Sequence, residues 1–114
     1  MLLWMWVDDE REAPEDHRWM IVRTVEIAIS WVKNPPCEGW EVISLDHDMG
    51  DETPGVNGSA VLKAIQEMVM TDDTYICPRI LVHTANGSAH GAMKTMATRT
   101  MELARERGRL IHEE

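Results

Sequence analysis

Short apolar runs alternate along this chain with amphipathic segments of helical period. An unbroken apolar run, unlike one that alternates with polar residues, is typical of a strand covered on both faces in a parallel α/β sheet. Such runs predict strands at residues 2–7, 19–22 and 80–82, and a further strand is expected at the mostly apolar residues 40–45.

Helices are expected between and after these strands. The first follows Thr24, a good N-cap, because apolar residues then recur at i, i+3, i+4 and i+7. The second is expected from Asn57 to Thr71 and the third from about Ser88 to Arg107. Residues 11–17 are polar and contain a proline, so a loop is expected between the first two strands.

The alternation of strands and helices predicts a single α/β domain over residues 1–114. Its sheet should be mostly parallel, with four to five strands and helices on both faces. Whether Leu110 and Ile111 form a fifth, edge strand is left open by the sequence.

Charge and composition narrow the classes of function. The formal net charge of -9 argues against binding to duplex nucleic acid and suits a cation site or a small ligand held through a metal. The apolar run at residues 2–7 is too short for a membrane span and lacks the basic start of a signal peptide. Cys37 and Cys77 lack metal-binding spacing, so we expect a cytoplasmic protein with reduced thiols. The oligomeric state is open.

Polar residues follow the expected strands at their carboxyl ends. In a parallel sheet these ends share one edge, where ligands bind. The residues expected to meet there follow all four strands: Asp8 and Asp9, Arg23 and Thr24, Asp46, His47 and Asp48, and finally His83, Thr84 and Asn86.

Crowded carboxylates raise one another's pKa unless a cation is present, and Mg²⁺ prefers such oxygen ligands. Asp8, Asp9 and Asp46 are the first candidates as metal ligands, and Asp48 is a fourth. Mg²⁺ is the expected ion. Mn²⁺ is the alternative, because imidazole from one of the nearby histidines would favour Mn²⁺, Fe²⁺ or Zn²⁺. Alternatively, the acidic pair only caps the loop that follows it.

The two histidines, His47 and His83, could act as general acid and base, since imidazole titrates near neutral pH. Thr84 and Asn86 could donate hydrogen bonds to phosphate oxygens, and Arg11 could clamp a phosphate. Each has a structural alternative. His83 could bond a backbone carbonyl, Thr84 and Asn86 could cap a helix, and Arg11 could pair with a neighbouring glutamate.

These residues resemble those of receiver domains of two-component signalling. Asp8-Asp9 is similar to their acidic metal-binding pair, Asp46 to their phospho-accepting aspartate, and Thr84-Ala85 to their switch threonine and the small residue after it. Receivers also have a helix between the first two strands and a lysine after the fifth strand. Here only a loop is available, and residues 108–114 contain no lysine.

The stretches at residues 7–14, 45–50 and 83–86 resemble the receiver-derived cyclic-phosphate processing receiver domains of bacteria and phages. The resemblance implies a flavodoxin-like sheet and an enzyme or binder acting on cyclic phosphates. Three hypotheses follow: a metal-dependent phosphoesterase for cyclic phosphates or cyclic nucleotides, a non-catalytic module that binds a nucleotide signal or a partner protein, and a true phospho-receiver. The missing lysine disfavours the third. The expected ligand is a small phosphate-containing molecule.

Overall fold

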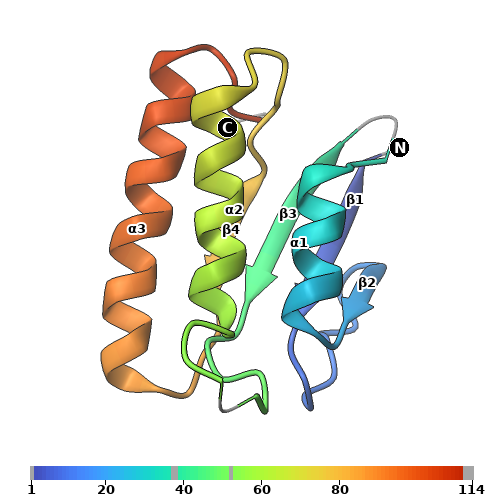
Figure 1. Cartoon of the computed structure of the whole chain (residues 1–114). Helices are drawn as coiled ribbons and strands as arrows, with labels where there is room; N and C mark the ends of the chain where they lie inside the picture. The colour runs from blue at the N-terminus through green and yellow to red at the C-terminus, as the bar shows by residue number, and fades with distance from the viewer. Residues whose placement is uncertain (1, 37–38, 52, 112–114) are drawn as a thin grey trace.

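The computed structural model describes residues 2–36, 39–51 and 53–111. Within them the chain forms one parallel sheet in the order β2-β1-β3-β4. Its strands are β1 (Leu3–Val7), β2 (Trp19–Val22), β3 (Trp40–Leu45) and β4 (Arg79–Val82). The helices are α1 (Val25–Lys33), α2 (Gly58–Thr71) and α3 (Gly87–Glu106), shown in Figure 1.

Side-chain caps fix where the helices begin. The Thr24 hydroxyl accepts a hydrogen bond from the Ile27 amide and so caps α1. The Asn57 side chain caps α2, and that of Asn86 caps α3, each by accepting from a first-turn amide. The predicted elements are therefore confirmed, with boundaries that differ by one or two residues.

Two helices cover one face of the sheet. In Figure 1, α1 and α2 lie side by side in front of the strands. Met5 and Val7 of β1 point to this side and join the same buried apolar cluster as Val25 of α1 and Ile65 of α2. α3 packs against α2 and β4. It also borders a groove on the opposite face, to which its Lys94 contributes.

On that opposite face the loop between β1 and β2 takes the place of a helix, as the sequence predicts. The Trp6 indole donates to the Arg11 carbonyl at 3.1 Å, and the Trp4 ring stacks on His17 at 3.6 Å between ring centroids. Trp19 donates to Asp16 at 3.3 Å. The tryptophans therefore anchor the loop against the sheet.

At the β4 edge, Leu110 forms one isolated parallel bridge with Cys77. A single bridge is not a strand, so within the described residues the sheet has four strands. None of the described helices is long and apolar enough to cross a lipid bilayer.

Candidate functional site

Backbone hydrogen bonds continue past the strands and align the residues that follow them. The Asp8 amide donates to the Val22 carbonyl, the Asp46 amide to Val7, and the His83 amide to Leu45, at 3.1, 2.9 and 2.9 Å. The first residues after β1, β3 and β4 therefore lie side by side along the carboxyl edge of the sheet.

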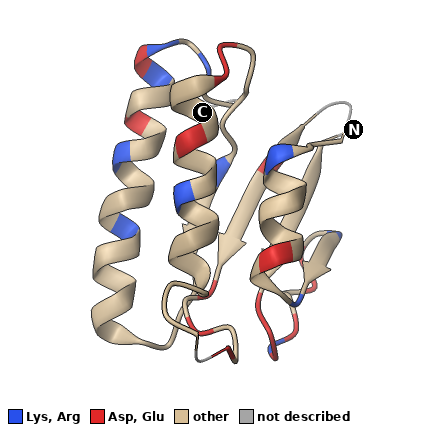
Figure 2. Cartoon of the chain, in the orientation of Figure 1, with Lys and Arg blue, Asp and Glu red and all other residues tan. Residues whose placement is uncertain are grey.

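Three carboxylates converge at this edge. Asp8, Asp9 and Asp46 each place one oxygen within 4.8 Å of the others. Asp8 is only 1% exposed and Asp46 only 5%. Figure 2 shows acidic residues concentrated in the loops at this end of the strands. The sequence prediction that these three side chains meet is consistent with this geometry.

A glycine shapes the loop beside Asp9. Gly50 has a φ of 71°, and a Cβ built on it would lie 2.7 Å from Asp9 Oδ2. A side chain at this position would be strained and would also push the carboxylate away. Gly50 thus allows the loop after β3 to approach the acidic pair.

Arg11 lies among the carboxylates. Its Nε is 3.2 Å from Asp8 Oδ2 and its Nη2 is 3.5 Å from Asp46 Oδ2. Glu12, one of the glutamates next to Arg11 in the sequence, instead pairs with Arg23 at 3.4 Å. Arg11 therefore offsets part of the negative charge at the edge, and its side chain is 48% exposed.

Asp8 is buried and ionised. Burial raises the pKa of this carboxyl, but amide hydrogen bonds from Arg11 and Glu10 to Oδ1, the His83 bond and the Arg11 charge together lower it below the ordinary value of 3.8. Both amide bonds are 2.9 Å long. Asp8 is thus a charge held in a fixed position, as a buried carboxylate must be.

His83 links this carboxylate to the sheet interior. Its Nε2 is 3.1 Å from Asp8 Oδ2 and its Nδ1 is 2.7 Å from the Ser44 hydroxyl. The ring stacks on Trp6 with the ring centroids 3.7 Å apart.

Burial lowers the pKa of His83 below 6.5, and the Asp8 carboxylate offsets this only in part. The ring is therefore neutral at pH 7. Since a carboxylate only accepts, Nε2–H donates to Asp8, and the Ser44 hydroxyl donates to Nδ1 of His83. Both ring nitrogens thus have protein partners.

His47 is placed differently. Its Nδ1 is 2.8 Å from Asp48 Oδ1, while its Nε2 makes no hydrogen bond to any described residue. The His47 bond lowers the pKa of Asp48, and the Asn86 side chain adds to this effect. Asp48 is 66% exposed and lies outside the group of three carboxylates.

Thr84 and Asn86 both take part in the turn that begins α3. The Thr84 hydroxyl accepts from the Asn86 amide at 3.1 Å, and Asn86 Oδ1 accepts from the Ala89 amide at 3.2 Å. Asn86 therefore caps α3, which is the structural alternative that the sequence left open for it. Contacts of either residue with a substrate stay a prediction.

Sequence reasoning missed Ser44 and Gly58. Ser44 is only 2% exposed, and in the sequence it is a polar residue among the apolar residues 42–45, which was the signal available for it. At Gly58, a Cβ would lie 1.7 Å from the Asp46 carbonyl oxygen. Only glycine therefore lets α2 start so close to Asp46.

The comparisons with known proteins identify the family. A family model described as "Cyclic-phosphate processing Receiver domain" matches residues 3–99. The chain belongs to this family. The match runs from β1 into α3 and includes the edge residues described above, from Asp8 to Asn86. The predicted resemblance and the receiver-like, flavodoxin-type α/β fold are thereby confirmed. No curated protein and no solved structure matches the chain.

Proposed function

We propose that this cyclic-phosphate processing receiver domain is a metal-dependent phosphoesterase for cyclic phosphates or cyclic nucleotides. The convergence of Asp8, Asp9 and Asp46 within 4.8 Å at the carboxyl edge carries the proposal. A small phosphate-containing ligand, a cytoplasmic location, and no binding of duplex nucleic acid or membranes belong to the same proposal.

The donor set fits a hard divalent cation. Three carboxylates, two of them buried, supply oxygen ligands only, and the Arg11 guanidinium neutralises part of their charge. Asp8, Asp9 and Asp46 would hold Mg²⁺, with Mn²⁺ as the alternative. Such a cation supplies charge stabilisation at a phosphate oxygen. Asp48, predicted as a fourth ligand, is better placed to orient His47.

His47 is the residue we assign to proton transfer. Asp48 holds Nδ1, so Nε2 is left to accept a proton from the attacking water. The water oxygen bonds to phosphorus, one ring P–O bond breaks, and the departing alkoxide takes up a proton. The imidazolium of His47 holds a proton that can supply it. The fixed Asp48 partner stabilises that imidazolium.

His83 was predicted to share this role, and that stays a prediction. Its neighbours give it a second role, which is to fix the Asp8 carboxylate through Nε2–H. Arg11 is half-exposed and would contact a phosphate oxygen, as would Thr84 and Asn86 at the start of α3.

A non-catalytic binding module is the second candidate. The observation that favours it is that both nitrogens of His83 and both oxygens of Asp8 already have protein partners. Side chains that are already paired in this way suit a binding site as well as a catalytic one.

The test is incubation with 2′,3′- and 3′,5′-cyclic nucleotides, with Mg²⁺ or with EDTA, followed by phosphorus NMR. We expect hydrolysis that EDTA abolishes and that His47→Ala slows by about 100-fold or more, the usual size of an acid–base contribution. His17→Ala is the matched control, because His17 stacks on Trp4 in the loop between β1 and β2.

The other results distinguish the candidates. Binding without product would leave the binding module. Phosphorylation of Asp46 by acetyl phosphate would indicate a true phospho-receiver. Hydrolysis that survives in EDTA, or in the triple variant Asp8→Asn, Asp9→Asn, Asp46→Asn, would overturn the proposed site.

A further inference from the structure

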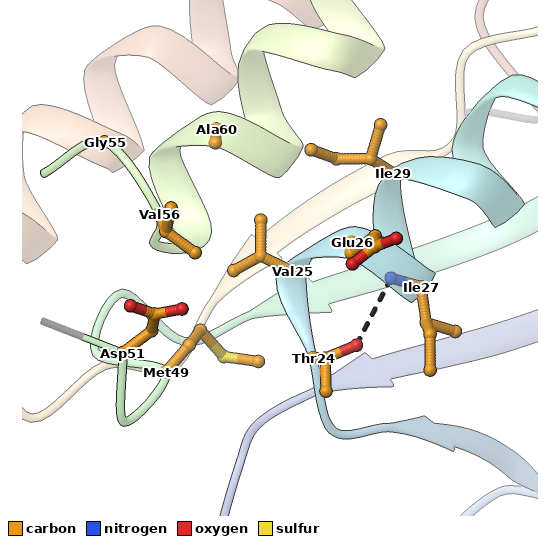
Figure 3. Close-up of a pocket in the computed structure, with 10 residues that line it drawn as sticks. All are labelled: Thr24, Val25, Glu26, Ile27, Ile29, Met49, Asp51, Gly55, Val56 and Ala60. Atoms are coloured by element: carbon orange, nitrogen blue, oxygen red, sulfur yellow. Dashed lines mark hydrogen bonds between the residues drawn. The ribbon is translucent and has the colours of Figure 1, made fainter. Parts of the chain in front are cut away.

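A cavity of about 850 Å³ lies between the start of α1 and the loop that leads into α2. Figure 3 shows Val25 and Ile29 of α1 facing Val56 and Ala60 across it, with Met49 between the two sides. Its volume is within the range of small-molecule sites, about 300–1,000 Å³. The activity proposed above does not by itself use this cavity.

The cavity adjoins the carboxylate site. Met49 and Asp51 line it, and between them stands Gly50, whose Cα faces Asp9 so closely that a Cβ would lie 2.7 Å from Asp9 Oδ2. On the other side, Thr24 lines the cavity two residues after Val22, whose carbonyl accepts from the Asp8 amide. The rest of a ligand whose phosphate is held at the three carboxylates would therefore lie next to this cavity.

The residues that line the cavity determine which kind of ligand group it can bind. The walls are aliphatic side chains and one thioether, which suit a flat apolar group. The charged groups among the described lining residues are two carboxylates, Glu26 and Asp51. The Thr53 side chain and the Thr53 amide, the latter at 2.8 Å, donate hydrogen bonds to Asp51 and lower its pKa, so it is an ionised acceptor. Such a lining repels anions and favours a group that carries N–H donors.

We propose that this cavity binds the nucleoside part of the substrate, specifically a nucleobase with an exocyclic amino group. The proposal rests on the proposed function and names its substrate class as nucleoside cyclic phosphates. Val25, Ile29 and Val56 pack against the base, and Asp51, whose carboxylate points toward Val56 in Figure 3, accepts from its amino group.

The experiment compares three cyclic phosphates in Mg²⁺: cytidine 2′,3′-cyclic phosphate, its uridine counterpart, and ethylene phosphate, which has no nucleoside. Cytidine and uridine have nearly the same size, but the first carries an amino group where the second carries a carbonyl. We expect kcat/KM to fall about tenfold from cytidine to uridine. The double variant Glu26→Gln, Asp51→Asn should bring that ratio close to one.

Filling the cavity tests the location. Val56→Trp should lower the ratio of kcat/KM for the cytidine substrate to that for ethylene phosphate by at least tenfold. Met70→Trp, at an exposed position near the end of α2, adds the same ring elsewhere and should leave this ratio unchanged. Ala60→Met is a second, smaller filling variant, and circular dichroism checks that each variant folds. Binding of cytidine alone, followed by amide chemical shifts, provides a readout without turnover.

The outcomes separate the two proposals. Turnover of the nucleotides with ratios unaffected by all cavity variants would overturn the cavity assignment and leave the phosphoesterase standing. Cytidine binding that Val56→Trp abolishes, without turnover of any of the three compounds, would support the cavity and overturn the phosphoesterase. A preference for uridine over cytidine would also overturn the assignment.

Discussion

At the scale of single residues, Asp8 is the centre of the site. It is 1% exposed, yet it stays ionised because amides, a guanidinium and an imidazole surround its two oxygens. An unpaired charge at such a depth would be strongly destabilising. The cost of burial is offset by hydrogen bonds that also fix the direction of the carboxylate, which is a requirement for a preorganised site.

His83 contributes to the pH dependence of stability near neutral pH. Because its folded pKa is lowered below 6.5, protonation favours the unfolded chain. The free energy of unfolding, measured by urea denaturation in EDTA, should therefore decrease as pH falls below 6.5. The slope is limited to about 1.4 kcal/mol per pH unit for one proton.

His83→Gln should remove this part of the pH dependence. The free energy of unfolding should still decrease at lower pH, where Asp8, whose pKa is lowered in the folded protein, becomes protonated. A His17→Gln control in the loop should retain it. An unchanged slope between pH 7 and 5.5 in His83→Gln would contradict the assigned environment of His83.

At the scale of elements, the start of α2 is set by its approach to the strand end. Gly58 donates its amide to the His47 carbonyl at 2.9 Å, while its Cα faces the Asp46 carbonyl. This contact positions the helix start behind the very residues that follow β3. A helix can begin there only because Gly58 has no side chain.

Gly58→Ala should destabilise the protein by about 3 kcal/mol or more, because the neighbour in the way is backbone and cannot rotate aside. Gly91→Ala is the matched control, since a Cβ there would meet nothing within 4 Å in the exposed part of α3. It should stabilise by about 0.5–1 kcal/mol, as glycine is a poor helix former. Thermal or urea unfolding measures both, and equal effects of the two substitutions would contradict the packing at Gly58.

A separate prediction concerns the Cys77 thiol at the edge of the sheet. This thiol is fully buried beside the bridge to Leu110, and burial raises its pKa from 9.0 to about 12. In a Cys37→Ser background, alkylation of Cys77 by iodoacetamide at pH 8 should be slow in the native protein and fast in urea. Since the unfolded thiol ionises first, stability should also decrease as pH rises above 9. Rapid native alkylation, read by mass spectrometry, would show that this edge opens readily.

At the scale of the whole molecule, the net charge is -9, and many of the acidic residues lie at the carboxyl edge of the sheet. Repulsion among Asp8, Asp9 and Asp46 opposes folding in the absence of a cation, and a ligand that binds only the folded state stabilises it. The proposed metal site can therefore be tested without any substrate.

Mg²⁺ should raise the melting temperature by several degrees, since saturation at 100 times the Kd contributes about 2.7 kcal/mol. Asp9→Asn should lose this increase, while its metal-free melting temperature stays equal or rises because one repulsive charge is gone. Glu67→Gln on the exposed side of α2 is the matched charge control and should keep the increase. KCl at equal ionic strength separates binding from screening. A Mg²⁺ effect that is the same in Asp9→Asn would contradict the metal site.

Local sequence patterns were enough to predict the strands, the helices and the loop that replaces the helix after β1. Apolar periodicity, capping side chains and prolines act over a few residues, so they are visible along the chain. The parallel arrangement added one long-range conclusion, that Asp8 and Asp46 lie at the same edge, and the backbone bonds from Asp8 to Val22 and from Asp46 to Val7 agree with it.

Only the tertiary structure decided which side chains contact one another at that edge. It paired Arg11 with Asp8 and Asp46, placed Asp48 with His47, and joined Ser44 to Asp8 through His83. These contacts depend on strand register, burial and side-chain direction, which distant segments fix together. The sequence determined which residues reach the edge, whereas packing decided which of them meet there, because a side-chain contact has no local signature along the chain.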